Sequence, residues 1–285
     1  ECPAVDLTTP CTKWSYQVRT INEIPDVVNE AFRVALSGRP GPVAIDLPKD
    51  IMTMKTEDDV GHSKYPKEYE PKPLSKEVKQ IIKYISKAKR PIIIAGAGCK
   101  DCPHILEQFV NKTEIPVVST LHGLGSLSDT HPHSIGFVGM HGNPASNIAV
   151  QNSDLIISLG SRFDDRITGG YNNFAPHAIK LHVDIDKEQL TKVAKIANVD
   201  HSYHSTVYHM LSEIMNHKDF KRTFRDGWLD EVYQWQIDND IFGNYKPPED
   251  SMKVQCVLRT MNNIIQENDL DVTFTTGVGN HQMMC

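Results

Sequence analysis

The segment SRFDDRITGG, residues 161–170, holds the densest group of charged side chains in this sequence. Arg162, Asp164, Asp165 and Arg166 all fall within five consecutive residues. Guanidinium groups bind phosphate through paired hydrogen bonds, and neighbouring carboxylates can balance their charge. By charge alone, a phosphate-binding loop and a solvated loop of salt bridges are equally good interpretations of this segment.

Small or polar residues follow three apolar segments that have the composition of buried strands. They are Gly96, Ala97 and Gly98, then Thr120, Leu121 and His122, then Gly160, Ser161 and Arg162. The carboxyl ends of parallel strands meet at one edge of a sheet, so this row suits a nucleotide whose phosphates need close backbone approach. A single GAG turn is weak evidence, because glycine after a strand also serves simple turns. Asp184 ends the next predicted strand, where a carboxylate can bind ribose hydroxyls, and this favours the phosphate interpretation.

The elements that must position these residues alternate regularly. An amphipathic helix starting at Ser75, a possible capping residue, is followed by strands and further helices. The strands are predicted at Pro91–Ala95, Ile115–Ser119, Asp154–Leu159 and Ile179–Ile185, and the helices at His104–Asn111 and Asn143–Gln151. Uninterrupted apolar strands separated by helices indicate a parallel sheet covered on both faces. The predicted fold class is α/β, with a doubly wound parallel sheet as the central domain.

Changes in composition divide the chain further. Residues 1–54 contain a helical pattern and a buried strand, VAIDL, and are predicted to be part of a first domain; residues 55–74 are polar and proline-rich, as in a linker. The central domain is placed at 75–215. Residues 216–270 are expected to be a helical connector, and 271–285, with the strand DVTFTTG, the start of a third domain. Because the chain begins at Glu1 without Met, it is expected to be a fragment.

Composition excludes several classes of protein. A net charge of −6, with 39% hydrophobic and 23% charged residues, is typical of a globular protein and argues against a nucleic-acid binder. The apolar runs are too short for a membrane span. Cys99 and Cys102 have CxxC spacing, but no second pair follows at finger spacing, so no metal site is predicted. Histidines near strand ends, including His182, are expected to be surface or packed imidazoles.

Four strings make a family resemblance specific: SGRPGPVAIDLPKDI, STLHGLGS, VGMHGNPASNIAVQNSDLIISLGSRFDDRITG and TTGVGNHQM. In this order they resemble the catalytic (large) subunits of acetohydroxyacid synthase, also called acetolactate synthase, which are thiamine-diphosphate enzymes. The resemblance implies that the central domain is of an FAD/NAD-binding-like type. It also implies that partial thiamine-diphosphate-binding folds flank it: the end of a pyrimidine-binding domain at 1–54 and the start of a diphosphate-binding domain at 271–285.

The resemblance implies two sets of cofactor-binding residues. The FAD set is Arg39, Gly96, Ala97, Gly98, Thr120, Leu121, His122, Met140, His141, Gly160, Ser161, Arg162, Asp164, Arg166, Ile167, Asp184 and Ile185. The thiamine diphosphate set is Val278, Gly279, Asn280 and His281. Lys13 and Lys49 resemble basic residues near the mouth of the family's substrate channel.

The implied activity is decarboxylation of pyruvate and condensation with a second 2-oxo acid, in branched-chain amino acid biosynthesis. No catalytic residue is expected in this chain: the activating glutamate is expected upstream of Glu1, and the Mg²⁺ ligands lie further into the third domain. The fragment alone is therefore expected to be inactive. The family's FAD does no net redox work. A homodimer or homotetramer and a possible regulatory subunit are implied, and the compartment stays open between cytoplasm, mitochondrion and plastid.

Three departures from the family pattern leave alternatives open. Ala97 replaces a frequent glycine, Asn280 replaces a glutamine, and His201 with Ser202 fall where a Gly-Asp pair usually helps to hold the adenine end of FAD. A degenerate homologue that acts as a nucleotide-binding or assembly module is one alternative. Another thiamine-diphosphate enzyme, such as pyruvate oxidase, is the other.

Overall fold

The computed structural model describes residues 2–56, 70–239, 253–277 and 279. The chain divides into two compact units, Glu1–Lys72 and Pro73–Cys285. This division falls within residues 55–74, the segment predicted to be a linker. The two units are described separately below.

The first unit is built on two short parallel strands, β1 (Trp14–Gln17) and β2 (Val43–Asp46). Its helices are α1 (Ala4–Thr8), α2 (Ile24–Leu36) and α3 (Lys49–Thr53). Val18, Val27 and Ile51 form its small buried core. The helix and the second strand were predicted, whereas β1 was not, because its sequence WSYQ has no apolar run.

The second unit contains a six-stranded sheet in the order β5-β4-β3-β6-β7-β8, and every neighbouring pair is parallel. The strands are β3 (Pro91–Ala95), β4 (Val117–Ser119), β5 (Ser134–Phe137), β6 (Leu155–Leu159), β7 (Ile179–Asp184) and β8 (His201–His204). The predicted α/β class with a parallel sheet is confirmed. The sequence did not reveal β5 and β8, because edge strands are partly exposed and lack a continuous apolar run.

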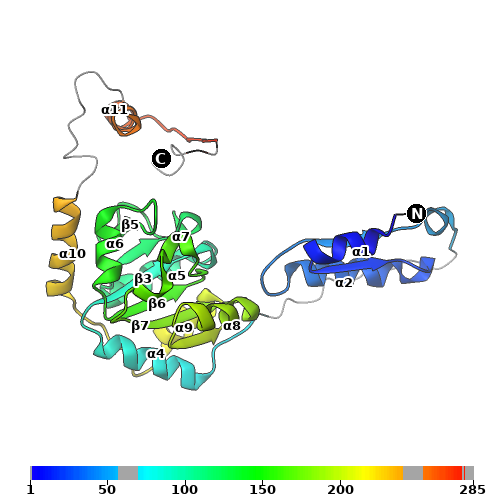
Figure 1. Ribbon diagram of the computed structural model, residues 1–285, viewed down its shortest axis with the longest axis horizontal. Helices are drawn as coiled ribbons and strands as arrows, with labels where there is room; N and C mark the ends of the chain where they lie inside the picture. Colours follow the sequence, from blue (N-terminus) through cyan, green and yellow to red (C-terminus); the bar gives the residue numbers. More distant parts are fainter. Residues whose placement is uncertain (1, 57–69, 240–252, 278, 280–285) are drawn as a thin grey trace. The chain divides into compact units, whose positions relative to one another are not determined.

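Helices cover both faces of this sheet (Figure 1). One face packs against α4 (Ser75–Lys87), α5 (Pro103–Thr113) and α9 (Val207–Asn216). The other packs against α6 (Pro144–Gln151), α8 (Lys187–Ile196) and α10 (Asp226–Asp238). Trp228 of α10 is buried in the second core and donates its indole N–H to the Pro91 carbonyl at 2.8 Å. The segment expected to be a connector therefore supplies one layer of the domain.

Two local predictions were wrong. Ser75 was expected to cap α4, but it is the first residue of the helix; the Glu77 carboxylate accepts the Leu74 backbone N–H at 2.7 Å instead. Residues 271–277, expected to be a strand, have no strand structure after α11 (Val254–Glu267). A strand needs a neighbour for its hydrogen bonds, and no described strand pairs with this segment.

The turns after β3 and β6 pack backbone against backbone. The Gly96 N–H donates to the Leu159 carbonyl at 2.9 Å, and the Gly98 N–H donates to the Gly160 carbonyl at 3.3 Å. A Cβ at Gly96 would overlap the carbonyl of Gly160, and Gly160 itself has a φ of +58°. Both positions therefore require glycine for reasons of packing and conformation. Ala97, in contrast, is exposed, so its methyl group does not disturb the turn.

Cys99 and Cys102 are buried in the core beside this turn. Burial raises the pKa of the Cys102 thiol to about 11 and raises that of Cys99 further. Thiols that resist deprotonation are poor nucleophiles and poor metal ligands. In the described part of the chain, no group of three His, Cys, Asp or Glu side chains could hold a metal ion. No described helix is both long enough and apolar enough to cross a membrane.

Replacing Gly96 with alanine is expected to lower the free energy of unfolding by about 1–3 kcal/mol, because the new methyl group would force the two turns apart. Urea unfolding measures the change. Gly227→Ala is the matched control: its Cβ would meet nothing within 4 Å in α10, so it should be neutral or slightly stabilising. A neutral Gly96→Ala variant would show that the turns are not tightly packed.

The buried thiols predict a loss of stability at alkaline pH. In the unfolded chain they ionise near pH 8.5, whereas in the folded chain they stay protonated, so each lowers the free energy of unfolding by about 1.4 kcal/mol per pH unit above that value. Cys102 contributes this loss up to its folded pKa of about 11. Between pH 8 and pH 10, Cys99→Ala should lose about 2 kcal/mol less than the wild type under reducing conditions.

Cys11→Ala is the control for the alkaline measurement, because Cys11 is exposed. Its loss of stability between the two pH values should equal that of the wild type. The same loss in Cys99→Ala and the wild type would contradict the assignment to buried thiols.

Candidate functional site

The residues that follow the strands lie in a continuous row along the carboxyl edge of the six-stranded sheet. The first residues after β4, β3, β6 and β8 each donate the N–H to a carbonyl of the neighbouring strand: Thr120 to Ala95 at 2.9 Å, Gly96 to Leu159 at 2.9 Å, Gly160 to Val183 at 2.8 Å and Ser205 to Asp184 at 3.1 Å. The turns predicted to bind a ligand are therefore brought together at one edge.

The GMHG segment and the RFDDR segment contact each other at this edge. The Met140 N–H donates to the Arg166 carbonyl at 2.7 Å, and the Arg166 guanidinium contacts the Met140 sulfur at 3.6 Å. A Cβ at Gly139 would overlap the Arg166 carbonyl, so glycine permits this approach. The structure thus places side by side two segments that are more than twenty residues apart in the sequence. His141, which follows Met140 in the GMHG segment, is exposed.

The RFDDR segment does not form a closed network of salt bridges. Arg162 contacts the Asp164 carboxylate at 3.3 Å through one nitrogen, and its side chain is 51% exposed. Arg166 has the Met140 sulfur as its described side-chain partner rather than a carboxylate. One carboxylate oxygen of Asp164, Oδ1, is buried without a partner among the described residues. Guanidinium donors therefore remain available, which favours the phosphate-binding interpretation over the salt-bridge loop.

A pocket of about 270 Å³ opens beside this segment. This volume suits a phosphate group or part of a nucleotide rather than a whole dinucleotide. The side chains around it are Arg162, Phe163, Asp164, Asp165, Arg166, Tyr171, Gln189, Lys192 and Ile196. Gln189 also fixes the segment, because its side-chain amide donates to the Arg162 carbonyl at 3.1 Å.

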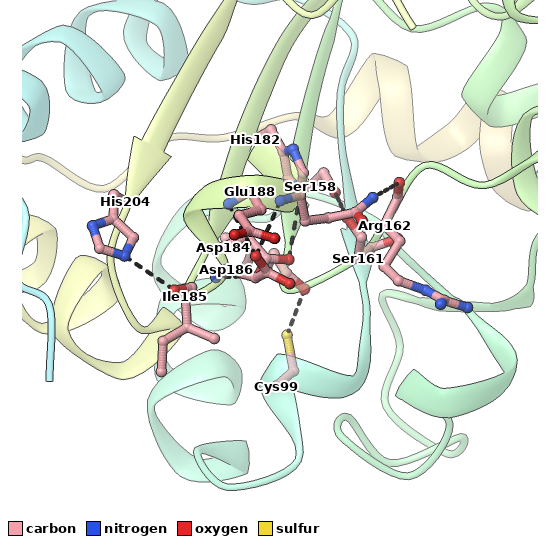
Figure 2. Close-up of polar contacts among 12 residues, drawn as sticks. Cys99, Ser158, Ser161, Arg162, His182, Asp184, Ile185, Asp186, Glu188 and His204 are labelled. Carbon is pink, nitrogen blue, oxygen red and sulfur yellow. Dashed lines mark hydrogen bonds and ion pairs between the residues drawn. The ribbon is translucent and has the colours of Figure 1, made fainter. Parts of the chain in front are cut away.

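Asp184 ends β7 and lies in the same row of residues (Figure 2). Its Oδ1 accepts the Asp186 N–H at 2.9 Å, and its Oδ2 lies 3.6 Å from Nε2 of His182. Figure 2 shows Arg162 on the opposite side of Asp184 from His204, whose ring contacts the Ile185 carbonyl at 3.0 Å. An acid and a guanidinium group thus occupy neighbouring turns, as a ribose and a phosphate would require.

The predicted residues after β4 have mainly structural contacts. The Thr120 hydroxyl accepts the Gly123 N–H at 3.2 Å and so closes its own turn. Leu121 is partly exposed and His122 is exposed. Thr120, Leu121 and His122 therefore lie along the edge but have no described ion pair there.

The remaining predicted residues lie elsewhere. Arg39, Lys13 and Lys49 belong to the first unit, where the Lys13 ammonium donates to the Val34 and Ser37 carbonyls. Of the four residues predicted to bind thiamine diphosphate, Val278, Asn280 and His281 lie outside the described residues, and Gly279 is described.

The structure places His201 and Ser202 away from the other predicted site residues. They begin β8 and so lie at the amino edge of the sheet, where the His201 ring contacts the Tyr84 hydroxyl at 2.6 Å. The carboxyl end of β8 is followed by Ser205 and Thr206, and the Thr206 hydroxyl accepts the His209 N–H at 3.0 Å to cap α9. His201 and Ser202 therefore lie at the opposite edge of the sheet from the turns of the candidate site.

The sequence analysis missed one side chain at this edge, Phe163, and left the burial of another, His182, open. Phe163 is buried with a φ of +50°, an uncommon conformation for a bulky residue, and no local sequence signal announces it. His182 was expected to be a packed or surface imidazole, and it is fully buried beside Asp184. Its position two residues before Asp184 on the same strand was the available signal, because alternate residues of a strand share a face.

Comparisons with known proteins identify the central part of the chain. Residues 78–213 match the family described as "Thiamine pyrophosphate enzyme, central domain". Over 99% of its length, the chain is 32% identical to the mitochondrial acetolactate synthase catalytic subunit of Saccharomyces cerevisiae and 36% identical to the acetolactate synthase large subunit of Lactococcus lactis. It is 33% identical to the acetolactate synthase isozyme 2 large subunit of Escherichia coli over the same share.

The chain spans about half the length of these relatives, covering 44%, 48% and 49% of them respectively. The matched residues 78–213 contain β3 to β8 and the turns of the candidate site. Residues 78–213 therefore match the central domain of thiamine pyrophosphate enzymes, and the chain is similar along almost its whole length to acetolactate synthase catalytic and large subunits.

Proposed function

We propose that this chain is part of an acetolactate synthase catalytic subunit, in which it contributes the central, FAD-binding domain. Similarity to such subunits over 99% of the chain carries the proposal. The reaction would be decarboxylation of pyruvate and condensation with a second 2-oxo acid. Thiamine diphosphate would supply the electron sink for the decarboxylation.

The carboxyl edge fits an extended nucleotide in three respects. Gly96 and Gly160 let the two turns pack closely, which brings the residues after β3 and β6 together at this edge. Arg162 and Arg166 offer donors that the described protein leaves available. Asp164 Oδ1 and both ring nitrogens of His182 are buried without partners, so the edge has hydrogen-bonding capacity that its own residues do not use.

The residues that would hold FAD are those of the second unit named above: the turns after β3, β4 and β6, the GMHG segment, and Asp184 with Ile185. FAD would contribute to structure in this reaction and not to net electron transfer. Thiamine diphosphate would be held by residues 278–281, and Mg²⁺ by residues beyond this chain.

The relatives' names also bear on assembly. Two of them are large subunits, which implies a smaller regulatory partner for those proteins. We extend this to the present protein, together with a homodimer or homotetramer in which two copies build each thiamine diphosphate site.

Replacing Arg162 with alanine is expected to raise the dissociation constant for FAD at least tenfold, because a charge-assisted hydrogen bond contributes about 1.5–3 kcal/mol. Quenching of flavin fluorescence during titration measures the constant. Arg222→Ala is the matched control: Arg222 is also exposed and also contacts a carboxylate at 3.3 Å, but it pairs with Glu114 away from the carboxyl edge. Equal affinities in wild type and Arg162→Ala would refute the flavin assignment.

The 285-residue chain, supplied with pyruvate, thiamine diphosphate, Mg²⁺ and FAD, is expected to form no acetolactate, because it spans about half of its relatives and the activating glutamate is expected outside it. A longer protein that contains this sequence should form acetolactate, detected colorimetrically. Product from the chain alone would contradict the first expectation. A longer protein that yields no product with any 2-oxo acid would contradict the proposed function, and bleaching of the flavin during turnover would indicate an oxidase.

A further inference from the structure

His182 is a fully buried histidine whose hydrogen-bonding capacity the described protein leaves unused. It lies near the end of β7 and has 0% exposure, yet neither Nδ1 nor Nε2 has a hydrogen-bond partner. A buried polar group without a partner costs free energy, about 1–3 kcal/mol, so such a group in a folded protein calls for an explanation. The strand could accommodate an apolar residue here, as Ile94 and Ile156 show on the same sheet face.

The ring of His182 lies beside the carboxylate that ends its strand. Its Nε2 is 3.6 Å from Oδ2 of Asp184, slightly longer than a hydrogen bond and too short for an intervening water. The other carboxylate oxygen, Oδ1, is already held by the Asp186 N–H at 2.9 Å. Asp184 is therefore fixed on one side, and the Nε2–H tautomer of His182 can fix the other side by a small movement.

His182 also contacts the segment that carries the arginines. The Phe163 ring packs edge-on against the imidazole, with ring centroids 5.2 Å apart and an interplanar angle of 79°. The Phe163 ring also makes an edge contact with the ring of Phe174. Phe163 is flanked by Arg162 and Asp164 and has a φ of +50°. One buried imidazole thus contacts both the carboxylate of β7 and the segment after β6.

We propose that His182 is a positioning residue that aims the Asp184 carboxylate at the 2′-hydroxyl of the ribose of an adenine nucleotide. This inference rests on the proposed FAD site, because the adenosine half of FAD carries such a ribose. The Nε2–H of His182 donates to Oδ2 and holds the carboxylate plane, so that a lone pair of the carboxylate faces the hydroxyl proton. If His182 served only to fill the core, its replacement would weaken all ligands equally.

The experiment compares ADP with 2′-deoxy-ADP, measured by calorimetry on the full 285-residue chain. A site that hydrogen-bonds a hydroxyl discriminates against the ligand that lacks it, so the wild type should bind ADP about tenfold more tightly. His182→Asn, whose amide reaches only the Nδ1 position, should bring the ratio close to one while leaving the affinity for 2′-deoxy-ADP within about twofold. His182→Gln, whose amide reaches the Nε2 position, should restore most of the ratio.

His201→Gln is the matched control, because His201 lies at the opposite edge of the sheet and contacts Tyr84. It should leave the ratio unchanged, and circular dichroism confirms that each variant is folded. If His182→Asn weakens both ligands equally or weakens neither, the positioning role is refuted while the nucleotide site stands. If the wild type binds neither ADP nor FAD, the proposed site and this inference both fall.

Discussion

The close backbone contact between the turns after β3 and β6 is the constraint on which the functional edge depends. Gly96 and Gly160 approach until no Cβ could be inserted at Gly96, and the N–H groups at these turns bond across to neighbouring strands. Because these hydrogen bonds are made within the protein, the turns hold their positions without a ligand. Arg162 follows Gly160 by two residues, so this contact fixes the point on the sheet edge from which its side chain extends.

The apolar pattern of the sequence was sufficient to predict the central strands and to place the candidate ligand-binding residues at the carboxyl edge of the sheet. β3 and β6 are apolar along most of their length because helices cover both faces, and such runs are readable without a structure. β5 and β8 have the sequences SIGF and HSYH, which carry no such run. Without β8, the sequence did not show that His201 and Ser202 begin a strand and therefore lie at the amino edge of the sheet.

The candidate site was predictable where local chemistry defines it and not where tertiary packing does. Glycine and charged residues after the strands were visible from spacing alone, and the family resemblance joined Met140 to the same edge. The left-handed conformation of Phe163 and the burial of His182 depend on residues from separate elements meeting in the core. The same holds for α10: its Trp228 is a core residue, although the sequence around it is polar enough to suggest a connector.

Phe163 has a consequence for how quickly the edge can capture a ligand. Its backbone conformation costs on the order of 1–3 kcal/mol, and burial of its ring between His182 and Phe174 offsets that cost in the unliganded protein. The backbone next to Arg162 is thus ordered before any ligand arrives, so binding at the proposed nucleotide site would not have to wait for the loop to fold. Preorganisation of this kind would raise the affinity of the proposed site, because the loop would lose less conformational entropy on binding. With a smaller side chain in place of Phe163, the loop would have to become ordered at each binding event.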